Sequence, residues 1–525
     1  MIARTSFSFS TSRIQSIVGR TLGLLSAVLC LTGSTGCQTG GGRKSASAVA
    51  PDQLQQSLVE ISVTRVETDR FLPWRKSQPI AQRGYGVAVG TNLLLTVEEL
   101  VRNNTLIQIR RAGSGAYVPA RVVLADPRSS LALVAPVYPS QMPPFLPLGL
   151  VSNIQREASH TLVQFGAGDQ IQAASGAITA IGLDQVARGS APQLTYDIVS
   201  DLRAAQAGTP VLINGRLAGL IVRLKPNSNA CLAIAPEVLA RFLTAARQTP
   251  FVGVPEGGFE FAALVDPVRR RFLGVADNDK GVLVVSLRSG GSAESGMQVD
   301  DVLVAWDGFS VDNMGFYLHP MYGRLPLSHL ISSRRSVGES VEVDVVRKGE
   351  PQRLTLTLQA YNELASRVPE NGRGAPDDYV VEGGLIFREL TLDYLQQHGE
   401  AWLLRAEPRL VWEALTQAYQ KTEPDRRLVI LVGVLPDPIN IGYQTLQNQI
   451  VTSVNGQPIE NLSQLAQIIA SGGLTRLGME GWTEAPLFFD AAMMPAANAR
   501  IQAGYRIPSL TRITKSPGAS DPIAP

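Results

Sequence analysis

The chain is poor in cysteine and histidine, with three and four residues respectively, and its formal net charge is only +2 over 525 residues. Three cysteines are too few for a disulfide framework. No Cys/His cluster has the spacing of a metal site, so we expect neither a metal nor a cofactor. A nearly balanced charge without a long basic run argues against a nucleic-acid partner. The apolar run at residues 22–31 is too short to span a bilayer as a mature helix.

The N-terminus has the pattern of an export signal, because three arginines precede this apolar run. Residues 1–36 are therefore a predicted signal peptide. The run ends in Ser34-Thr35-Gly36-Cys37, which resembles a bacterial lipobox and makes Cys37 the predicted lipidation site. Cleavage by ordinary signal peptidase, without a lipid, is the alternative. The predicted location is the cell envelope, with a lipid anchor in the outer membrane and a flexible Gly/Ser-rich tether over residues 37–51.

The length of the chain predicts several domains. Residues 52–250 contain many short apolar runs bounded by Gly, Pro and Asn, a pattern typical of a β-barrel or sandwich, and a helical pattern closes this region. Residues 256–360 and 379–512 then form two related modules, because V-L-V-A-W-D-G and I-V-T-S-V-N-G each run a strand into an Asp/Asn-Gly turn. Residues 361–378 are a predicted linker, and residues 513–525 a disordered tail.

Four motifs occur in a characteristic order: G-Y-G-V-A-V-G at 84–90, L-L-T-V-E-E-L-V at 94–101, S-S-L-A-L-V at 129–134 and A-Q-A-G-T-P-V-L-I-N-G at 205–215. They resemble the landmarks of the HtrA/Deg family of trypsin-like serine proteases, and the last module is most similar to the plant-type Deg proteases. The resemblance implies a mainly β protein with some α, a trypsin-like double β-barrel followed by two PDZ domains. It also implies a homo-trimer, or a mixed trimer with an HtrA paralogue.

The sequence departs from the family at the three triad positions. A serine protease needs a nucleophilic hydroxyl, an imidazole base and a carboxylate that orients the imidazole. The motifs place Glu99 at the base position, Ser130 at the carboxylate position and Ala207 at the nucleophile position. Ala205, two residues earlier, also disfavours the backbone conformation of an oxyanion hole. We therefore predict that the chain is not an enzyme.

Other residues offer little replacement for a triad. Ser175, Thr209 and Cys231 are conceivable nucleophiles in apolar or small-residue contexts, and Cys231 is expected to be a buried small hydrophobe. His160 begins a predicted strand and is interpreted as a surface residue. Two alternatives remain: an HtrA-type endopeptidase with a non-standard active site in protein quality control, and an inactive subunit of a mixed trimer with an active paralogue.

The resemblance moves the expected function to the PDZ modules, which bind peptides by adding a strand to a free sheet edge. It implies two peptide-binding segments, one formed by Gly258, Phe259, Glu260 and Phe261, the other by Gly383, Gly384, Leu385 and Ile386. The second segment keeps more glycine and fits a groove better, although plant-type relatives can fill it from within the oligomer.

Two charged features near the first segment have alternative interpretations. Glu260 either disfavours a terminal carboxylate or faces solvent. Arg269, Arg270 and Arg271 either contact a peptide or form a solvated helix face. The predicted function is that of a protein- or peptide-binding adaptor or chaperone-like scaffold in the bacterial cell envelope, with unfolded or extended protein segments as partners.

Overall fold

The computed structural model describes residues 51–166, 169–186, 191–202, 205–225, 229–276, 278–362, 366–370, 378–399, 401–417, 426–481 and 486–513. The predicted signal peptide, Cys37, the tether, most of the linker and nearly all of the tail lie outside these residues. All of these described residues belong to one compact unit. Among the described helices, none is both long and apolar enough to cross a membrane.

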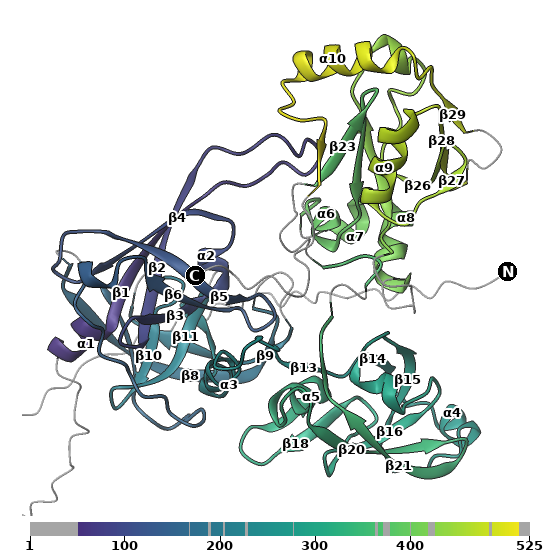
Figure 1. The fold of residues 1–525 in the computed structure, drawn as a ribbon. Coiled ribbons are helices and arrows are strands. Elements are labelled where there is room, and N and C mark those ends of the chain that lie inside the picture. The colour runs from purple at the N-terminus through teal and green to yellow at the C-terminus, as the bar shows by residue number, and fades with distance from the viewer. Residues whose placement is uncertain are drawn as a thin grey trace, which may run out of the picture. The chain divides into compact units, whose positions relative to one another are not determined.

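The first barrel closes six strands in the order β1-β2-β3-β6-β5-β4 (Figure 1). Its strands are β1 (Leu58–Arg65), β2 (Ile80–Gly90), β3 (Leu93–Val97), β4 (Asn104–Arg111), β5 (Val118–Asp126) and β6 (Leu131–Pro136). Alternate apolar side chains such as Val59, Ile61 and Val63 point inward and are fully buried. Helix α1 (Pro51–Ser57) precedes the barrel, and the short helix α2 (Glu98–Val101) follows β3.

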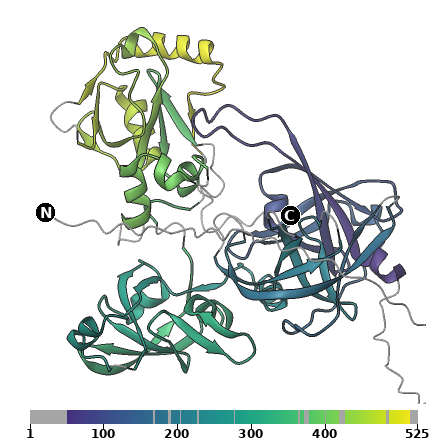
Figure 2. The ribbon, with the colours of Figure 1, turned by 180° about the vertical axis from the view of Figure 1, so that it is seen from behind.

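The second barrel repeats this closed arrangement in the order β10-β11-β12-β9-β8-β7, and Figure 2 shows both barrels from behind. The 3-10 helix η1 (Pro139–Gln141) lies between the barrels in the chain. The strands are β7 (His160–Phe165), β8 (Ile171–Asp184), β9 (Gln193–Ser200), β10 (Pro210–Ile213), β11 (Arg216–Leu224) and β12 (Ala230–Ile234). Helix α3 (Pro236–Ala245) ends the region, with proline in its first turn and buried Leu239 and Phe242. The predicted double barrel is confirmed.

The middle module contains the five-strand path β14-β15-β16-β20-β21, with β14 at one edge and Trp306 buried in its core. Its elements are β13 (Pro255–Glu256), β14 (Phe259–Ala262), α4 (Pro267–Phe272), β15 (Val282–Leu287), η3 (Ser292–Ser295), β16 (Val302–Trp306), β17 (Phe309–Ser310), β18 (Phe316–His319), β19 (Gly323–Pro326), α5 (Leu327–Ser333), β20 (Ser340–Arg347), β21 (Glu350–Thr357) and β22 (Gln359–Ala360).

The C-terminal module contains the path β29-β28-β26-β25-β24-β23-β30. Its strands are β23 (Tyr379–Glu382), β24 (Leu385–Glu389), β25 (Val429–Val434), β26 (Gln449–Val454), β27 (Gln457–Pro458), β28 (Arg476–Met479), β29 (Leu487–Phe488) and β30 (Thr511–Arg512). Its helices are α6 (Leu392–Gln396), α7 (Trp402–Arg405), α8 (Pro408–Trp412), η5 (Glu413–Gln417), η6 (Pro438–Asn440), α9 (Leu462–Gly472) and α10 (Met494–Tyr505).

Both modules contain the predicted Asp/Asn-Gly turn. Asp307 and Gly308 have positive φ between β16 and β17, and Asn455 and Gly456 have positive φ between β26 and β27. Two consecutive residues with positive φ form a type I′ turn, which suits the twist of a two-residue hairpin. The same local chemistry therefore builds the same hairpin in both modules.

The β1–β2 connection contacts the C-terminal module, which the sequence pattern did not predict. Arg70 pairs with Asp393 at 2.5 Å, and the ring centroids of Trp74 and Tyr379 are 5.7 Å apart. The carboxylate of Asp69 accepts from two backbone N–H groups that follow it, so the tip of the connection holds its own shape. This segment joins the first barrel directly to the C-terminal module.

Candidate functional site

The structure brings Glu99, Ser130 and Ala207, the predicted triad positions, into one neighbourhood around α2 and β2. The backbone N–H of Glu98 donates to the carbonyl of Ser130 at 2.9 Å, which joins the start of α2 to the turn before β6. The N–H of Tyr85 donates to the carbonyl of Ala207 at 2.9 Å, which holds the second-barrel turn against β2. Glu99 lies on α2 beside these contacts. The sequence landmarks therefore converge in space.

The side chains at these positions differ from a serine protease triad. Glu99 is exposed, whereas its neighbour Glu98 is buried and pairs with Arg102 at 2.6 Å. Ser130 has a φ of 58°, and its buried hydroxyl has no hydrogen-bond partner among the described residues. Ala207 is half-buried and offers only a methyl group. The assignment of these residues to the triad positions stays a prediction.

The alternative nucleophiles lie apart from a base. Ser175 is exposed on β8, and Thr209 is fully buried, with its hydroxyl accepting from the N–H of Gln206 at 3.2 Å. Cys231 is buried as predicted, and burial raises the pKa of its thiol. The interpretation of His160 as a surface residue is wrong, because it is 1% exposed and burial lowers its pKa. None of the three candidate side chains hydrogen-bonds to His160 in the described part of the chain.

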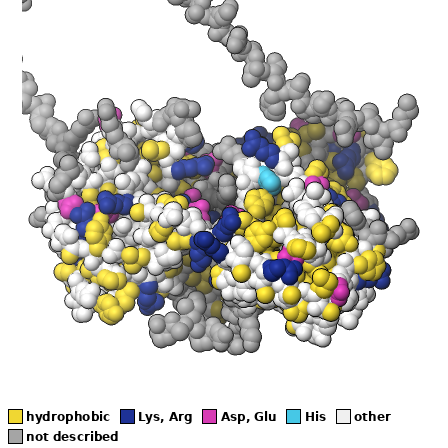
Figure 3. Space-filling model, turned by 90° about the horizontal axis from the view of Figure 1, so that it is seen from above, with side chains coloured by type: hydrophobic (Ala, Val, Ile, Leu, Met, Phe, Trp, Pro, Cys, Tyr) yellow, Lys and Arg dark blue, Asp and Glu magenta, His cyan; other side chains and the backbone are white. Residues whose placement is uncertain are grey.

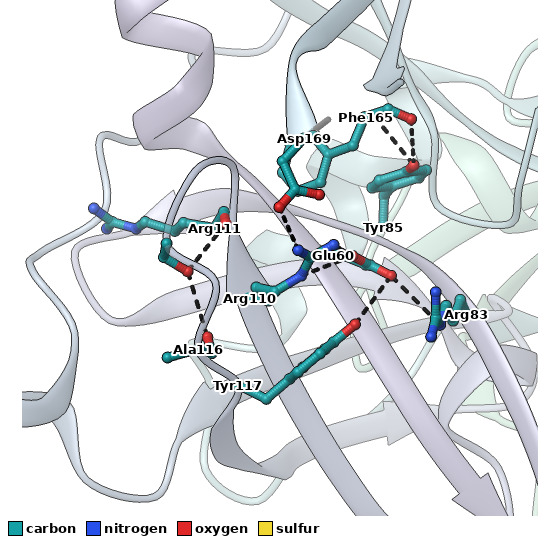
Figure 4. Close-up of polar contacts among 10 residues, drawn as sticks. Glu60, Arg83, Tyr85, Arg110, Arg111, Ala116, Tyr117, Phe165 and Asp169 are labelled. Atoms are coloured by element: carbon teal, nitrogen blue, oxygen red, sulfur yellow. Dashed lines mark hydrogen bonds and ion pairs between the residues drawn. The ribbon is translucent and has the colours of Figure 1, made fainter. Parts of the chain in front are cut away.

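A polar cluster ties the two barrels together beside this site (Figure 4). Arg110 of β4 lies between the carboxylates of Glu60, on β1, and Asp169, in the β7–β8 connection. Hydrogen bonding to Glu60, and then to Asp169, raises the pKa of Arg110. The Tyr85 hydroxyl accepts from the N–H of Phe165 at 3.1 Å and donates to the carbonyl of the same residue. These contacts hold β2 against the second barrel.

A pocket lies along β14 in the middle module. β14 pairs with β15 and ends the sheet, so its other edge has no strand partner in the described residues. The pocket has a volume of about 160 Å³, and its walls include Gly258, Phe259 and Phe261. The Phe259 ring stacks on Trp306 at 6.0 Å, which fixes the pocket floor. Three of the four residues predicted for the first peptide-binding segment therefore line one cavity.

The fourth residue of that segment faces away. Glu260 is exposed, and its carboxylate lies 3.3 Å from the Ser286 hydroxyl on the neighbouring strand. The solvent-facing interpretation of Glu260 is therefore the one that the geometry supports. The opposite wall comes from α5 through Ser328, Ile331 and Ser332. Sequence analysis missed this wall, although the apolar residues of L-S-H-L-I-S-S predict a helix that presents one face to the module.

Arg128 of the first barrel closes one end of this pocket. Its guanidinium lies 3.0 Å from Glu370, 3.3 Å from Glu256 and 4.4 Å from the ring of Tyr361. Arg288 also pairs with Glu256, at 2.7 Å. The planar guanidinium can meet two carboxylates and an aromatic face at once, which a lysine could not do. Sequence analysis did not single out this residue.

The second predicted peptide-binding segment is a closed hairpin. Gly383 and Gly384 both have positive φ and form the two-residue turn between β23 and β24. Leu385 and Ile386 are buried on β24. β24 pairs with β23 on one side and β25 on the other, so both of its edges are occupied. A peptide could add to β24 only after one of these strands had moved.

Side chains from elsewhere in the module hold this turn. The N–H of Gly383 donates to the Asn498 side chain at 2.8 Å, and the Asn440 amide donates to the carbonyls of Gly383 and Leu435. The backbone N–H of Gly383 therefore already has a hydrogen-bond acceptor within the module. Peptide binding at residues 383–386 stays a prediction, and the middle module offers the more accessible edge.

Comparison with protein families and known proteins agrees with this architecture. A family model described as a PDZ domain matches residues 368–512. Protease Do-like 2, chloroplastic, of Arabidopsis thaliana is 27% identical over 421 residues, covering 79% of this chain and 67% of its own length. Putative protease Do-like 13 of the same plant is 22% identical over 474 residues, covering 89% and 90%.

Solved structures of HtrA-type proteases also align with the chain. AlgW with a decapeptide has a TM-score of 0.45 and 16% identity, covering 59% of this chain and 98% of AlgW. AlgW with a tripeptide has a TM-score of 0.46 and 17% identity, covering 59% and 97%.

The comparisons correct the prediction that this chain is not an enzyme. The curated relatives are named proteases, and no comparison points to a degenerate member of the group. The absence of a hydroxyl at Ala207 and of an imidazole at Glu99 therefore describes an unusual site without establishing inactivity. The chain is similar to the HtrA/Deg proteases over most of its length, and it has a trypsin-like double barrel and a PDZ domain.

Proposed function

We propose that this HtrA/Deg-like protein captures unfolded or extended polypeptide segments at the free edge of β14, in protein quality control at the bacterial cell envelope. The observation that carries the proposal is the unpaired edge beside an apolar pocket. An extended segment would add to β14 through backbone hydrogen bonds, and its side chains would meet Phe259, Phe261 and Ile331. The middle module thus serves as a second PDZ-like domain.

The pocket geometry predicts which segments bind best. Aromatic and aliphatic side chains would fill the wall formed by two phenylalanines and Ile331. Compact folded proteins keep such side chains and free backbone groups inside, whereas unfolded chains expose both. The substrate class is therefore an extended, apolar-rich segment, and the binding step suits an adaptor or chaperone-like role.

A second candidate function is cleavage of the captured segment at a non-standard active site. The names of the curated relatives favour it. Because Ala207 has no hydroxyl, the attacking group would have to come from another residue or from water. Capture in the middle module would supply the barrels with substrate whichever group attacks.

The experiment measures binding and cleavage of fluorescent unfolded casein by the full chain. Replacing Ser328, on α5 in the pocket wall, by tryptophan fills the groove, and we expect at least a tenfold loss of casein affinity. Ser463→Trp is the matched control, because Ser463 is exposed on α9 of the C-terminal module. Equal losses in both variants, or none in Ser328→Trp, would refute the β14 site.

Cleavage is followed on the same samples by gel electrophoresis and by labelling with a fluorophosphonate probe. Fragments that persist in Ser175→Ala, Thr209→Val and Cys231→Ala would point to a group outside the candidate nucleophiles. Loss of fragments in one variant, with casein binding unchanged, would identify the attacking residue.

A further inference from the structure

Helix α4 of the middle module presents an exposed apolar surface. Val265, Val268 and Phe272 are 57%, 62% and 89% exposed. Arg269 and Arg271 are exposed on the same short helix. We call these five residues the α4 patch. It lies outside the β14 pocket, none of whose lining residues belongs to α4.

A capping carboxylate and a buried arginine fix α4 to the module, and the α4 patch stays exposed to solvent. The Asp266 carboxylate caps the helix by accepting from the N–H of Val268 at 2.8 Å, and Pro267 occupies its first turn. Arg270 is only 2% exposed, and its guanidinium donates to the carbonyls of Leu264, at 3.1 Å, and Ala276. The three arginines of the sequence therefore separate into one structural anchor and two exposed cations.

A further cation lies at the end of the helix. A Cβ atom placed on Gly274 would lie 2.5 Å from the Cα of Gly349, so the β20–β21 turn touches the chain just after α4. This turn carries Lys348. Arg269, Arg271 and Lys348 have no acidic partner in an ion pair among the described residues. The one acidic residue of the helix start, Asp266, is already engaged as its cap.

From this arrangement we propose that the α4 patch docks the middle module on an anionic lipid bilayer. Exposed Phe and Val side chains enter the boundary between headgroups and acyl chains, while flanking Arg and Lys side chains meet the anionic headgroups. A stable protein interface engages roughly 20–30 residues on each side. The α4 patch has only five residues, which suits a fluid surface that needs no complementary shape.

The number of cations distinguishes the α4 patch from the exposed apolar residues of α7. Leu403 and Leu404 are 52% and 89% exposed, with one exposed cation, Arg405, beside them on the same helix. The α4 patch has two cations, Arg269 and Arg271, and the turn that carries Lys348 touches the chain just after the helix. On the face shown in Figure 3, the dark blue cations form separate small groups among apolar and polar side chains. The proposal rests neither on peptide capture at β14 nor on lipidation of Cys37.

The test is co-sedimentation of the full chain with lipid vesicles. All variants carry Cys37→Ser, so that acylation contributes nothing and the leader contributes equally. Vesicles contain phosphatidylcholine alone or with about 30% phosphatidylglycerol. We expect stronger binding to the anionic vesicles, a loss of about tenfold in Phe272→Asp and a loss of at least about 25-fold in Arg269→Glu/Arg271→Glu. Leu404→Asp is the matched control and should bind as the parent chain does.

Two further measurements make the result decisive. Phe272→Trp keeps an aromatic side chain, and its added fluorescence should be quenched by brominated lipids in anionic vesicles. Sedimentation velocity without lipid measures the oligomeric state of every variant. Equal binding of all variants, no quenching at position 272, or dissociation of an oligomer in Phe272→Asp would each overturn the bilayer proposal.

Discussion

His329 should make the middle module sensitive to acid. It lies on α5, the helix that forms one wall of the β14 pocket, and is 6% exposed. Its Nδ1 atom is 2.6 Å from the Tyr317 hydroxyl, and its ring centroid is 5.7 Å from that of His319. Arg241 of α3 adds a positive charge nearby. Burial, His319 and Arg241 lower the pKa of His329 from its ordinary value of 6.5 to about 4.

The direction of the pH effect follows from proton linkage. Above pH 6.5 the His329 imidazole is neutral in both the folded and the unfolded chain, so its titration takes nothing from the free energy of unfolding there. Between pH 6.5 and about 4, the unfolded chain binds a proton that the folded chain does not bind. Stability is therefore lost as the pH falls through this range. At about 1.4 kcal/mol for each pH unit, the loss approaches about 3 kcal/mol.

Hydrogen-exchange mass spectrometry of the full chain measures this effect on peptides that cover α5, after correction for the intrinsic pH dependence of exchange. We expect protection of α5 to fall by about two orders of magnitude from pH 7 to pH 4.5. His329→Asn, whose Oδ1 takes the place of Nδ1 and can accept from the Tyr317 hydroxyl, should remove most of this dependence. Unchanged protection in the parent chain, or the same loss in His329→Asn, would refute the reasoning.

Three other substitutions, the first with a matched control, test the packing. Gly208→Ala places a Cβ atom 1.9 Å from the Tyr85 carbonyl oxygen at a φ of +82°. It should lower the free energy of unfolding by several kcal/mol and abolish the yield of soluble protein. Gly113→Ala is the control, because nothing lies within 4 Å of its Cβ atom, and it should lower the free energy of unfolding by only about 1 kcal/mol. Arg347→Met leaves the fully buried Asp301 carboxylate unpaired, and should lower the urea midpoint by the equivalent of about 3–5 kcal/mol. Trp74→Ala loosens the β1–β2 connection, and limited trypsin digestion should then cut it faster.

The double barrel could be predicted because its signals are local. Short alternating runs make strands with one buried face, and the four landmark motifs fall at β2, β3 with α2, the start of β6, and the turn before β10. The Asp-Gly and Asn-Gly dipeptides predicted both type I′ hairpins, because their positive φ is a property of the two residues themselves. The burial of Cys231 followed from its apolar neighbours.

Part of the candidate site could also be predicted. The resemblance led to Gly258, Phe259 and Phe261, which line one pocket, but it could not find Ser328 or Arg128, which come from other elements. Residues distant in the chain meet only after folding, so no local pattern identifies them. The same limit applies to activity. The sequence gives the side chains at positions 99, 130 and 207, from which we predicted that the chain is not an enzyme, and the comparison with named proteases corrected that prediction.

Sequence alone determined the strands, the turns and the identity of the residues at positions 99, 130 and 207. Tertiary structure alone decided which sheet edge is free. Within the described residues one edge of β14 has no strand partner, whereas β23 pairs with the matching edge of β24, and Gly383 and Gly384 form the turn between these two strands. It also separated Arg270, buried as an anchor, from its exposed neighbours. The physical reason is that strand pairing and burial depend on contacts between distant segments, whereas turn geometry and alternation depend on adjacent residues.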